Sequence, residues 1–366
     1  MDRRLDKLQA RIRSAIGCHA ASSIQRARLI DALSRPGYAL GRDSPCRAGT
    51  LSLAAYDAVR ASLDDAAYCA AAAVELQTQA AFLFDNVADF ELLDDVGYGA
   101  ELALAIALSE CASCVACEAL SISELAGSAG RDALIAFHRS CVGACAGQLL
   151  DALFEGRDDV TAREALEMTL LKSGNFGRLA AGFGARLAAA DAEVVADLEE
   201  LGRSLFTFAQ LVDDLRDACS TDLDDDWARG KKTVPLAFFH ERCECPLLPS
   251  NHDMMRLSRD ARHRYRTGEA PLFGALVAEA FFERARRTLE RLRGKPCRVM
   301  ELDRLVESLD RSFSSVLRSI EPARCPVAPR DADGRVRGPR DVRGSRDPGA
   351  GLGPARRRPR PDARAS

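Results

Sequence analysis

Apolar residues recur at three- and four-residue spacing along most of the chain, which is the spacing of one face of an α-helix. Ala is abundant in these segments, which favours helix and permits close approach of neighbouring helices. The alternation of apolar and polar residues that is typical of strands does not occur. The pattern predicts helices over residues 4–16, 22–33, 50–71, 72–90, 99–121, 130–154, 162–189, 191–219, 233–241, 254–266, 270–293 and 298–319.

Turn-forming stretches such as Pro36-Gly37 and Gly156 to Asp159 separate the predicted helices. We therefore predict an all-α fold, in which residues 1–322 form one bundle of long helices around a central cavity. Ligand sites in such bundles are built from side chains of facing helices. The most apolar run, residues 99–120, contains three Glu residues that would be costly in lipid, so we expect a buried bundle helix and no transmembrane segment.

The last part of the chain, residues 323–366, differs in composition from the rest. It consists mainly of Arg, Pro, Gly and Asp without periodic apolar residues, so it cannot bury enough surface to offset the entropy of ordering. We predict that this tail is disordered. From Pro322 onward the chain carries 12 Arg and 5 Asp, and because the whole chain has a net charge of −3, the remainder is acidic. An acidic body argues against nucleic-acid binding as the function.

The cysteines and the N-terminus indicate the cellular compartment. The chain contains 13 Cys, an odd number, and it begins with an amphipathic charged segment that lacks the apolar core of a signal peptide. These features predict reduced thiols and a cytoplasmic location. Cys111, Cys114 and Cys117 recur every three residues, but no separate CxxC pair completes a four-thiolate zinc set. We expect them to pack as small apolar side chains.

Two acidic clusters carry the candidate chemistry. Asp213, Asp214 and Asp217 follow one apolar helical stretch, and Asp85 and Asp89 follow another earlier in the chain. Residues four apart share a helix face, so Asp85 points the same way as Asp89, and Asp213 the same way as Asp217. Carboxylates this close repel one another. Either a solvated surface or a hard divalent cation such as Mg²⁺ would offset that repulsion.

Lysines accompany the acidic clusters. Lys231 and Lys232 precede Thr233-Val234-Pro235, where the proline suits the first turn of a helix. Lys172 lies in an apolar helix with few other cations, which favours ligand binding over a surface position. Carboxylates that can hold a metal ion, together with lysines that can hold an anion, indicate a site that handles phosphate groups.

These motifs resemble those of the polyprenyl synthetase (trans-isoprenyl diphosphate synthase) family, class I isoprenoid synthases, over roughly residues 30–320. The second signature of that family has a Gln three residues before DDxxD and a later GKxTxP. Gln210, Asp213 to Asp217 and Gly230 to Pro235 match this signature. Gly147 to Asp151 is similar to its GQxxD element, and Lys172-Ser173 to its Lys-Thr pair.

The first signature, DDxxD in the family, is Asp85-Asn86-Val87-Ala88-Asp89 here. Asn86 replaces the second Asp and supplies no charge, so we expect metal binding to be weaker than in the family.

The resemblance implies an isoprenoid-synthase-type bundle, a homodimer, and a Mg²⁺-dependent prenyltransferase that ionises an allylic prenyl diphosphate. The metal ligands that it implies are Asp85, Asp89, Asp213, Asp214 and Asp217. It implies catalytic roles for Asp85, Asp89, Asp213 and Lys172, and substrate binding by Lys172, Gln210, Lys231 and Arg47. Metal ions and lysines would neutralise the charge that grows on the leaving diphosphate as the carbon–oxygen bond ionises.

Most groups that bind the second substrate of the family, isopentenyl diphosphate, are missing. Only Arg47 remains of the GKRxRP element, Thr78 stands in place of a His, and no Arg occurs between Asp89 and Arg131. A diphosphate without cationic partners binds poorly. Three functions therefore stay open: prenyl transfer to isopentenyl diphosphate or a diverged acceptor, terpene cyclisation of one allylic diphosphate, and a non-catalytic partner subunit.

Overall fold

In the computed structural model, helix follows helix along the chain, and no strand occurs among the residues that the structure describes. These are residues 3–42, 44–89, 97–123, 125, 127–219, 230–242 and 259–320. The predicted all-α fold is confirmed. The tail predicted to be disordered, residues 323–366, and residues 254–258 of one predicted helix lie outside the described residues.

All described helices belong to one unit, Met1–Ala323. Its first helices are α1 (Arg3–His19), α2 (Ser23–Leu33), α3 (Arg47–Arg60), α4 (Asp65–Ala88), α5 (Tyr98–Ile122) and α6 (Ser128–Glu155). Then come α7 (Ala162–Thr169), the short π-helix η1 (Leu170–Gly174), α8 (Asn175–Leu187), α9 (Ala192–Cys219), α11 (Val234–Arg242), α12 (Arg259–Thr267), α13 (Glu269–Arg293) and α14 (Met300–Leu317).

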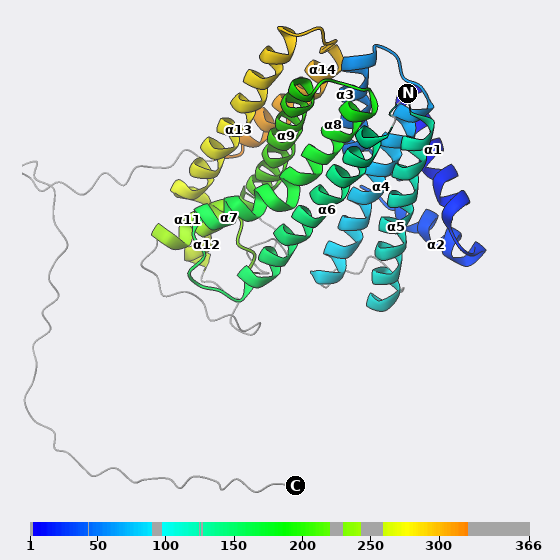
Figure 1. Cartoon of the computed structure of the whole chain (residues 1–366). Helices are drawn as coiled ribbons and strands as arrows, with labels where there is room; N and C mark the ends of the chain where they lie inside the picture. Colours follow the sequence, from blue (N-terminus) through cyan, green and yellow to red (C-terminus); the bar gives the residue numbers. More distant parts are fainter. Residues whose placement is uncertain are drawn as a thin grey trace, which may run out of the picture. The chain divides into compact units, whose positions relative to one another are not determined.

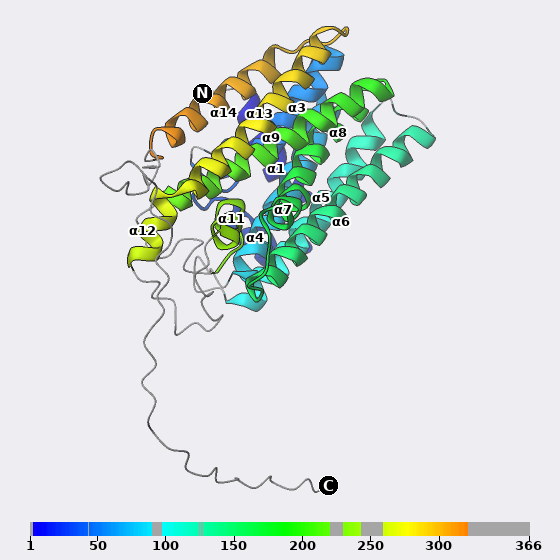
Figure 2. The same ribbon diagram turned by 90° about the vertical axis from the view of Figure 1, so that its left-hand side faces the viewer.

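The long helices run side by side in both views of the molecule (Figures 1 and 2). Helix α4 packs against α3 and α5, and α9 packs against α8 and α13. Helix α8 also contacts α3, α4 and α6, so it joins the two sets of helices. Phe208 of α9 lies against Phe282 of α13 and Phe313 of α14, with ring centroids 4.8 and 5.2 Å apart. The apolar faces of α9, α13 and α14 are thus buried against one another.

One predicted helix boundary is wrong. The sequence pattern predicts a break between residues 71 and 72, whereas the structure breaks the chain at residues 61–64. Ala61 adopts a positive φ of 59° after α3, and the Asp64 carboxylate accepts a hydrogen bond from the Ala67 N–H at 2.9 Å before α4. Asp is among the best N-cap residues, so it starts the new helix here. The apolar spacing continues across this break and therefore does not reveal it.

A second difference concerns the predicted helix over residues 162–189. The structure divides it into α7, η1 and α8 without a loop. A π-helix is rare and widens the backbone for one turn, and such turns occur frequently at functional sites.

Glycines allow α8 and α9 to touch. A Cβ atom on Gly177 would lie 2.0 Å from the carbonyl oxygen of Gly202, and a Cβ on Gly202 would lie 2.1 Å from that of Gly177. Both distances are far inside van der Waals contact, so the two backbones approach this closely because neither residue has a side chain.

We predict that Gly177→Ala lowers the free energy of unfolding. Forcing a methyl group into a packed contact costs about 1–3 kcal/mol, and the better helix propensity of Ala returns only about 1 kcal/mol. Urea denaturation followed by circular dichroism measures the change. The matched control is Gly99→Ala in α5, where a Cβ would meet no atom within 4 Å. Equal stability of the two variants would contradict the close packing of α8 on α9.

Candidate active site

The first acidic motif lies at the C-terminal end of α4. Asp85 is in the last turn, and Asp89 caps the helix with its N–H donating to the Asp85 carbonyl at 2.8 Å. The C-terminal end of a helix carries partial negative charge, which disfavours further anions there. Helix α4 has no basic residue in its last turn. The charge that stabilises these carboxylates therefore comes from other parts of the chain.

Lys172 of η1 supplies the first of these charges. Its Nζ donates to Asp85 Oδ1 at 2.9 Å and to Asp151 Oδ2 of α6 at 2.6 Å. Gln148, one turn before Asp151, donates from Nε2 to the same Asp85 oxygen at 2.7 Å. Burial acts to lower the pKa of Lys172, but the carboxylates of Asp85 and Asp151 outweigh it and the pKa is raised. Lys172 is therefore a fixed cation between two helices.

Lys231 supplies the second charge, from the segment that precedes α11. It forms an ion pair with Asp89, and its Nζ lies 3.8 Å from Asp151 Oδ2. Burial acts to lower the pKa of Lys231, but the nearby carboxylates, Asp151 and Asp85 foremost, raise it overall. The buried carboxylate of Asp151 is thus shared by two lysines that come from distant parts of the chain.

The second acidic motif reaches the same region through η1. Ser173, the neighbour of Lys172, donates from Oγ to Gln210 Oε1 of α9 at 3.1 Å. Gln210 in turn donates from Nε2 to Asp214 Oδ1 at 2.9 Å. Consecutive residues of the π-helix therefore contact the two acidic motifs, Lys172 the first and Ser173 the second. A chain of side-chain contacts through η1 thus links the two acidic motifs.

Gly147 of α6 lets η1 come close enough for these contacts. A Cβ on Gly147 would lie 2.2 Å from the backbone nitrogen of Lys172. Any side chain at this position would displace the turn that carries Lys172.

Asp213 is held by arginines. Arg47 at the start of α3 places Nη1 3.7 Å from Asp213 Oδ2, and Arg216 one turn later on α9 forms a second ion pair with Asp213. Asp217 follows on the same helix and is exposed. Arg47, which the resemblance assigns to substrate binding, thus contacts a predicted metal ligand in this structure.

The oxygen ligands at the site fit Mg²⁺, which prefers carboxylates and water and is usually bound by one or two carboxylates together with substrate phosphates. Within the described parts of the chain, no group of three or more His, Cys, Asp or Glu side chains lies close enough to hold an ion alone. Lysine ammonium groups and arginine guanidinium groups occupy these carboxylates instead. The ligand set is therefore suited to an ion that arrives together with a phosphate group.

Several site residues were missed at the sequence level. Asp151 and Gln148 belong to the recognised GQxxD element, whose three-residue spacing places both on one helix face, but they were given no role. Nothing in the sequence pattern marks Arg216. Arg216 is distinguished only by its partners in space.

The region expected to hold a second diphosphate offers few donors. The hydroxyl of Thr78 is buried and donates to the Val74 carbonyl at 2.9 Å. Arg35, in the turn after α2, is bound through both terminal nitrogens to the buried Glu101 of α5 at 2.5 and 3.2 Å. Residues 90–96, which follow the first motif, lie outside the described residues. These contacts leave Thr78 and Arg35 engaged with the protein itself.

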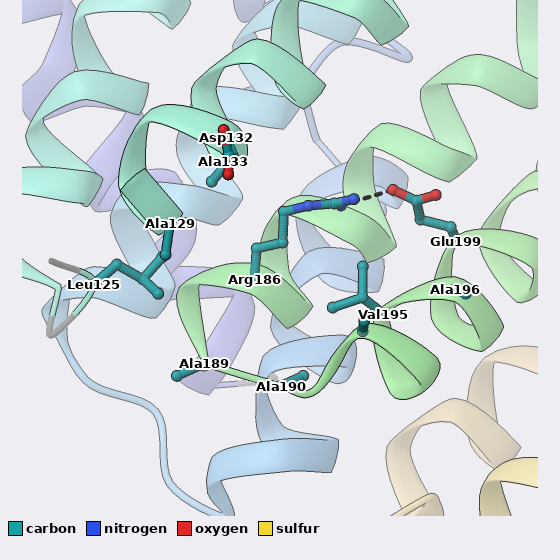
Figure 3. Close-up of a pocket in the computed structure, with 11 residues that line it drawn as sticks. Leu125, Ala129, Asp132, Ala133, Arg186, Ala189, Ala190, Val195, Ala196 and Glu199 are labelled. Carbon is teal, nitrogen blue, oxygen red and sulfur yellow. Dashed lines mark ion pairs between the residues drawn. The ribbon is translucent and has the colours of Figure 1, made fainter. Parts of the chain in front are cut away.

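A cavity of about 490 Å³ lies elsewhere, among the start of α6, the end of α8 and the start of α9 (Figure 3). Arg186 and Glu199 form an ion pair of 2.6 Å at its wall. Asp151, Lys172 and Asp213 lie toward the opposite ends of these segments. The central cavity predicted beneath the carboxylates stays a prediction.

Comparisons with known proteins all point to one family. The sequence model of the family described as polyprenyl synthetase matches residues 49–246, more than half of the chain. A short chain isoprenyl diphosphate synthase of Methanothermobacter thermautotrophicus is 34% identical over 118 residues, which cover 31% of this chain and 36% of the relative. A geranylgeranyl diphosphate synthase of Mycobacterium tuberculosis is 34% identical over 103 residues, 26% of this chain and 29% of the relative. The matches thus span about a third of the length of these curated relatives.

Solved structures of this family have a similar fold over most of the chain. A geranylgeranyl pyrophosphate synthetase from the archaeon Geoglobus acetivorans matches with a TM-score of 0.69 at 22% identity, over 85% of this chain and 98% of that one. A polyprenyl synthase from Caulobacter crescentus, complexed with calcium and isoprenyl diphosphate, matches with a TM-score of 0.68 at 20% identity, over 85% of this chain and 97% of that one. At these identities the likeness shows the fold.

We predict that Lys172→Met destabilises the metal-free protein and makes its stability depend on Mg²⁺. Removing one partner of a buried ion pair costs about 3 kcal/mol, because Asp85 loses its bonded lysine and Asp151 keeps only the more distant Lys231. Mg²⁺ would replace that charge, so urea unfolding in EDTA and in Mg²⁺ should differ more for the variant than for the wild type.

The control for this test is Lys295→Met, which removes a lysine bonded to Asp197 at 2.8 Å near the start of α9. It should show no added response to Mg²⁺. A Lys172→Met variant whose stability responds to Mg²⁺ no more than the wild type does would contradict metal binding at Asp85.

Proposed function

The chain belongs to the polyprenyl synthetase family, and from this premise we propose that it is a Mg²⁺-dependent prenyltransferase that ionises an allylic prenyl diphosphate. The observation that carries the proposal is the pair of lysines, Lys172 and Lys231, that share Asp151 and lie on the two carboxylates of the first motif. Two cations beside two carboxylates form a site for a metal ion and a polyanion at once.

Each group has a defined task in this proposal. Asp85 and Asp89 on α4 and Asp213, Asp214 and Asp217 on α9 would hold Mg²⁺, which when bound neutralises the charge of the diphosphate leaving group. Lys172 and Lys231, each with three N–H donors, turn from the carboxylates to the oxygens of the diphosphate. Donors fixed where negative charge develops stabilise the transition state for carbon–oxygen ionisation. Gln210 orients Asp214 from the neighbouring helical turn.

The acceptor of the prenyl cation follows from the family, whose curated relatives are named as isoprenyl diphosphate synthases. Prenyl transfer, including chain elongation with isopentenyl diphosphate, is therefore the proposed reaction. A second candidate, cyclisation of a single allylic diphosphate, is favoured by Thr78, which stands in place of a His and donates its buried hydroxyl to the Val74 carbonyl. It requires no second diphosphate site.

We predict that Asp85→Ala and Asp213→Ala each abolish release of diphosphate from farnesyl or geranylgeranyl diphosphate in the presence of Mg²⁺. Release is measured with the purified protein, with and without isopentenyl diphosphate, and the organic product is identified by mass spectrometry. A longer diphosphate indicates elongation, and a cyclic hydrocarbon or alcohol indicates cyclisation.

The control is Asp197→Ala on α9, a carboxylate paired with Arg291 and Lys295, which should retain activity. No turnover by the wild type would favour a non-catalytic partner subunit.

We also propose that the protein forms a homodimer through α6. Ile135, Val142 and Leu149 recur at seven-residue spacing on this helix, and all three are exposed, Val142 by 70%. Leu153 extends the same exposed apolar set, whereas Asp151 and Gln148 on another face of α6 contact the site. Apolar residues repeated every seven positions suit the packing of a helix against another helix.

The partner that fits this surface is a second copy of the chain. By length and composition, both α5 and α6 could cross a membrane, and only 28% of the most apolar window of α6 is buried. Glu101 of α5 and Asp151 of α6 are nevertheless buried and bonded to basic side chains of other segments. Both helices are therefore parts of the bundle, and α6 is left with one face to cover. The cytoplasmic location that the sequence predicts stays a proposal.

We predict that the double change Val142→Glu with Leu149→Glu converts the dimer into a monomer, because it places charges in the centre of an apolar contact. Light scattering coupled to size-exclusion chromatography measures the mass in solution. Leu276→Glu on α13, where the side chain is 63% exposed, is the control and should leave the mass unchanged. A wild-type protein that is monomeric at micromolar concentration would refute the proposal.

A further inference from the structure

Asn86, the residue that departs from the first signature of the family, has a specific partner. Its Nδ2 donates a hydrogen bond of 2.6 Å to the hydroxyl oxygen of Tyr38. Asn86 follows Asp85 directly in α4, and Tyr38 lies in the turn between α2 and α3. The contact thus brings a phenol hydroxyl from the N-terminal part of the chain to the first acidic motif.

Tyr38 is held firmly in this position. Its side chain is only 7% exposed. Its N–H donates to the Arg35 carbonyl at 3.1 Å, and its carbonyl accepts from the Gly41 N–H at 2.9 Å. The guanidinium of Arg35 is anchored on both oxygens of the buried Glu101. The hydroxyl of Tyr38 is therefore placed in advance, at no cost in ordering when a ligand binds.

The direction of the Asn86 hydrogen bond decides what the hydroxyl can do. An amide nitrogen only donates, so it occupies a lone pair of the Tyr38 oxygen and leaves the hydroxyl proton unused. Among the described residues, Tyr38 has no hydrogen-bond acceptor for that proton. Burial raises the pKa of Tyr38, and the opposing effects of the Asn86 hydrogen bond and of Arg35 are smaller. The phenol is thus protonated at neutral pH, and its O–H lies next to Asn86 of the first acidic motif.

We infer that Tyr38 donates this hydrogen bond to an oxygen of the diphosphate held at the first acidic motif, and that Asn86 is the positioning residue that directs the proton outward. The inference rests on the proposed function, because it supplies the anion. An Asp at position 86 would accept a hydrogen bond from the Tyr38 O–H, which could then no longer donate to the ligand. The amide is therefore suited to a neutral donor at a place where the family carries a further carboxylate.

The test compares Asn86→Asp with Asn86→Ala in the full-length protein, using calorimetric titration of inorganic pyrophosphate at saturating Mg²⁺. The Asp carboxylate would accept a hydrogen bond from the Tyr38 O–H, so that this O–H could no longer donate to the ligand. Ala removes the hydrogen bond at position 86 and leaves the Tyr38 O–H free to donate. We expect Asn86→Ala to bind pyrophosphate more tightly than Asn86→Asp does. A purely structural role of the contact, or a benefit from an added metal ligand, gives the reverse order, and that order would overturn the inference.

A second variant, Tyr38→Phe, removes the donor itself. A hydrogen bond to a charged acceptor is worth about 1.5–3 kcal/mol, so we expect the dissociation constant for pyrophosphate to rise about tenfold or more. In the Y38F background, Asn86→Asp should cause no further weakening, because the hydroxyl that would donate to the new carboxylate is absent. Unchanged affinity of Tyr38→Phe, or the same loss from Asn86→Asp in both backgrounds, would contradict the inference.

The matched control is Tyr56→Phe. Tyr56 is also buried, and its hydroxyl donates to Asp64 Oδ2 at 2.7 Å at the other end of α4. This change should lower the melting temperature and leave pyrophosphate binding intact. Failure of the proposed function has a different signature: the wild type with Mg²⁺ would not bind pyrophosphate, or Asp85→Ala would bind it equally well.

Discussion

Negative charge at the C-terminal ends of helices is the constraint on which this site depends. Asp85 lies in the last turn of α4, Asp151 near the end of α6, and Asp214 near the end of α9. Each helix end already carries partial negative charge, and neither α4 nor α6 has a basic residue in its last turn. Such an arrangement is stable only when cations come from elsewhere, and Lys172 and Lys231 provide them.

The same arrangement explains how the proposed site would exchange its ion pairs for a metal ion and a phosphate group. A buried ion pair contributes little net stability, because the cost of removing both charges from water nearly cancels their attraction. The lysine–carboxylate contacts can therefore be exchanged at small cost for contacts of carboxylate with metal ion and of lysine with phosphate. Asp151 contacts both lysines and so links them in the ligand-free site.

The sequence predicts the fold and most of the site because both depend on local spacing. Helical periodicity and carboxylates four residues apart are visible without coordinates, and the GKxTxP stretch marks Lys231. The π-helix at Lys172 is not visible, and neither is the close approach of its backbone to Gly147 of another helix. The pairing of Arg47 with Asp213 also depends on how α3 meets α9, which no local pattern specifies. For the same reason Asn86 looks like a weakened metal ligand in the sequence, and only the presence of Tyr38 gives the amide a positive reason to be there.

Helix α6 connects the proposed dimer to the chemistry of the site. Gln148 and Asp151 contact Asp85 and Lys172 on one face of this helix, while Leu149 and Leu153 are exposed on another. A helix with one face uncovered can shift, and a shift of 1 Å in a catalytic group can cost a hundredfold in rate. Burying the outer face of α6 against a second copy would hold Asp151 in place beneath both lysines. Dimer formation would then contribute to catalysis through the position of one carboxylate.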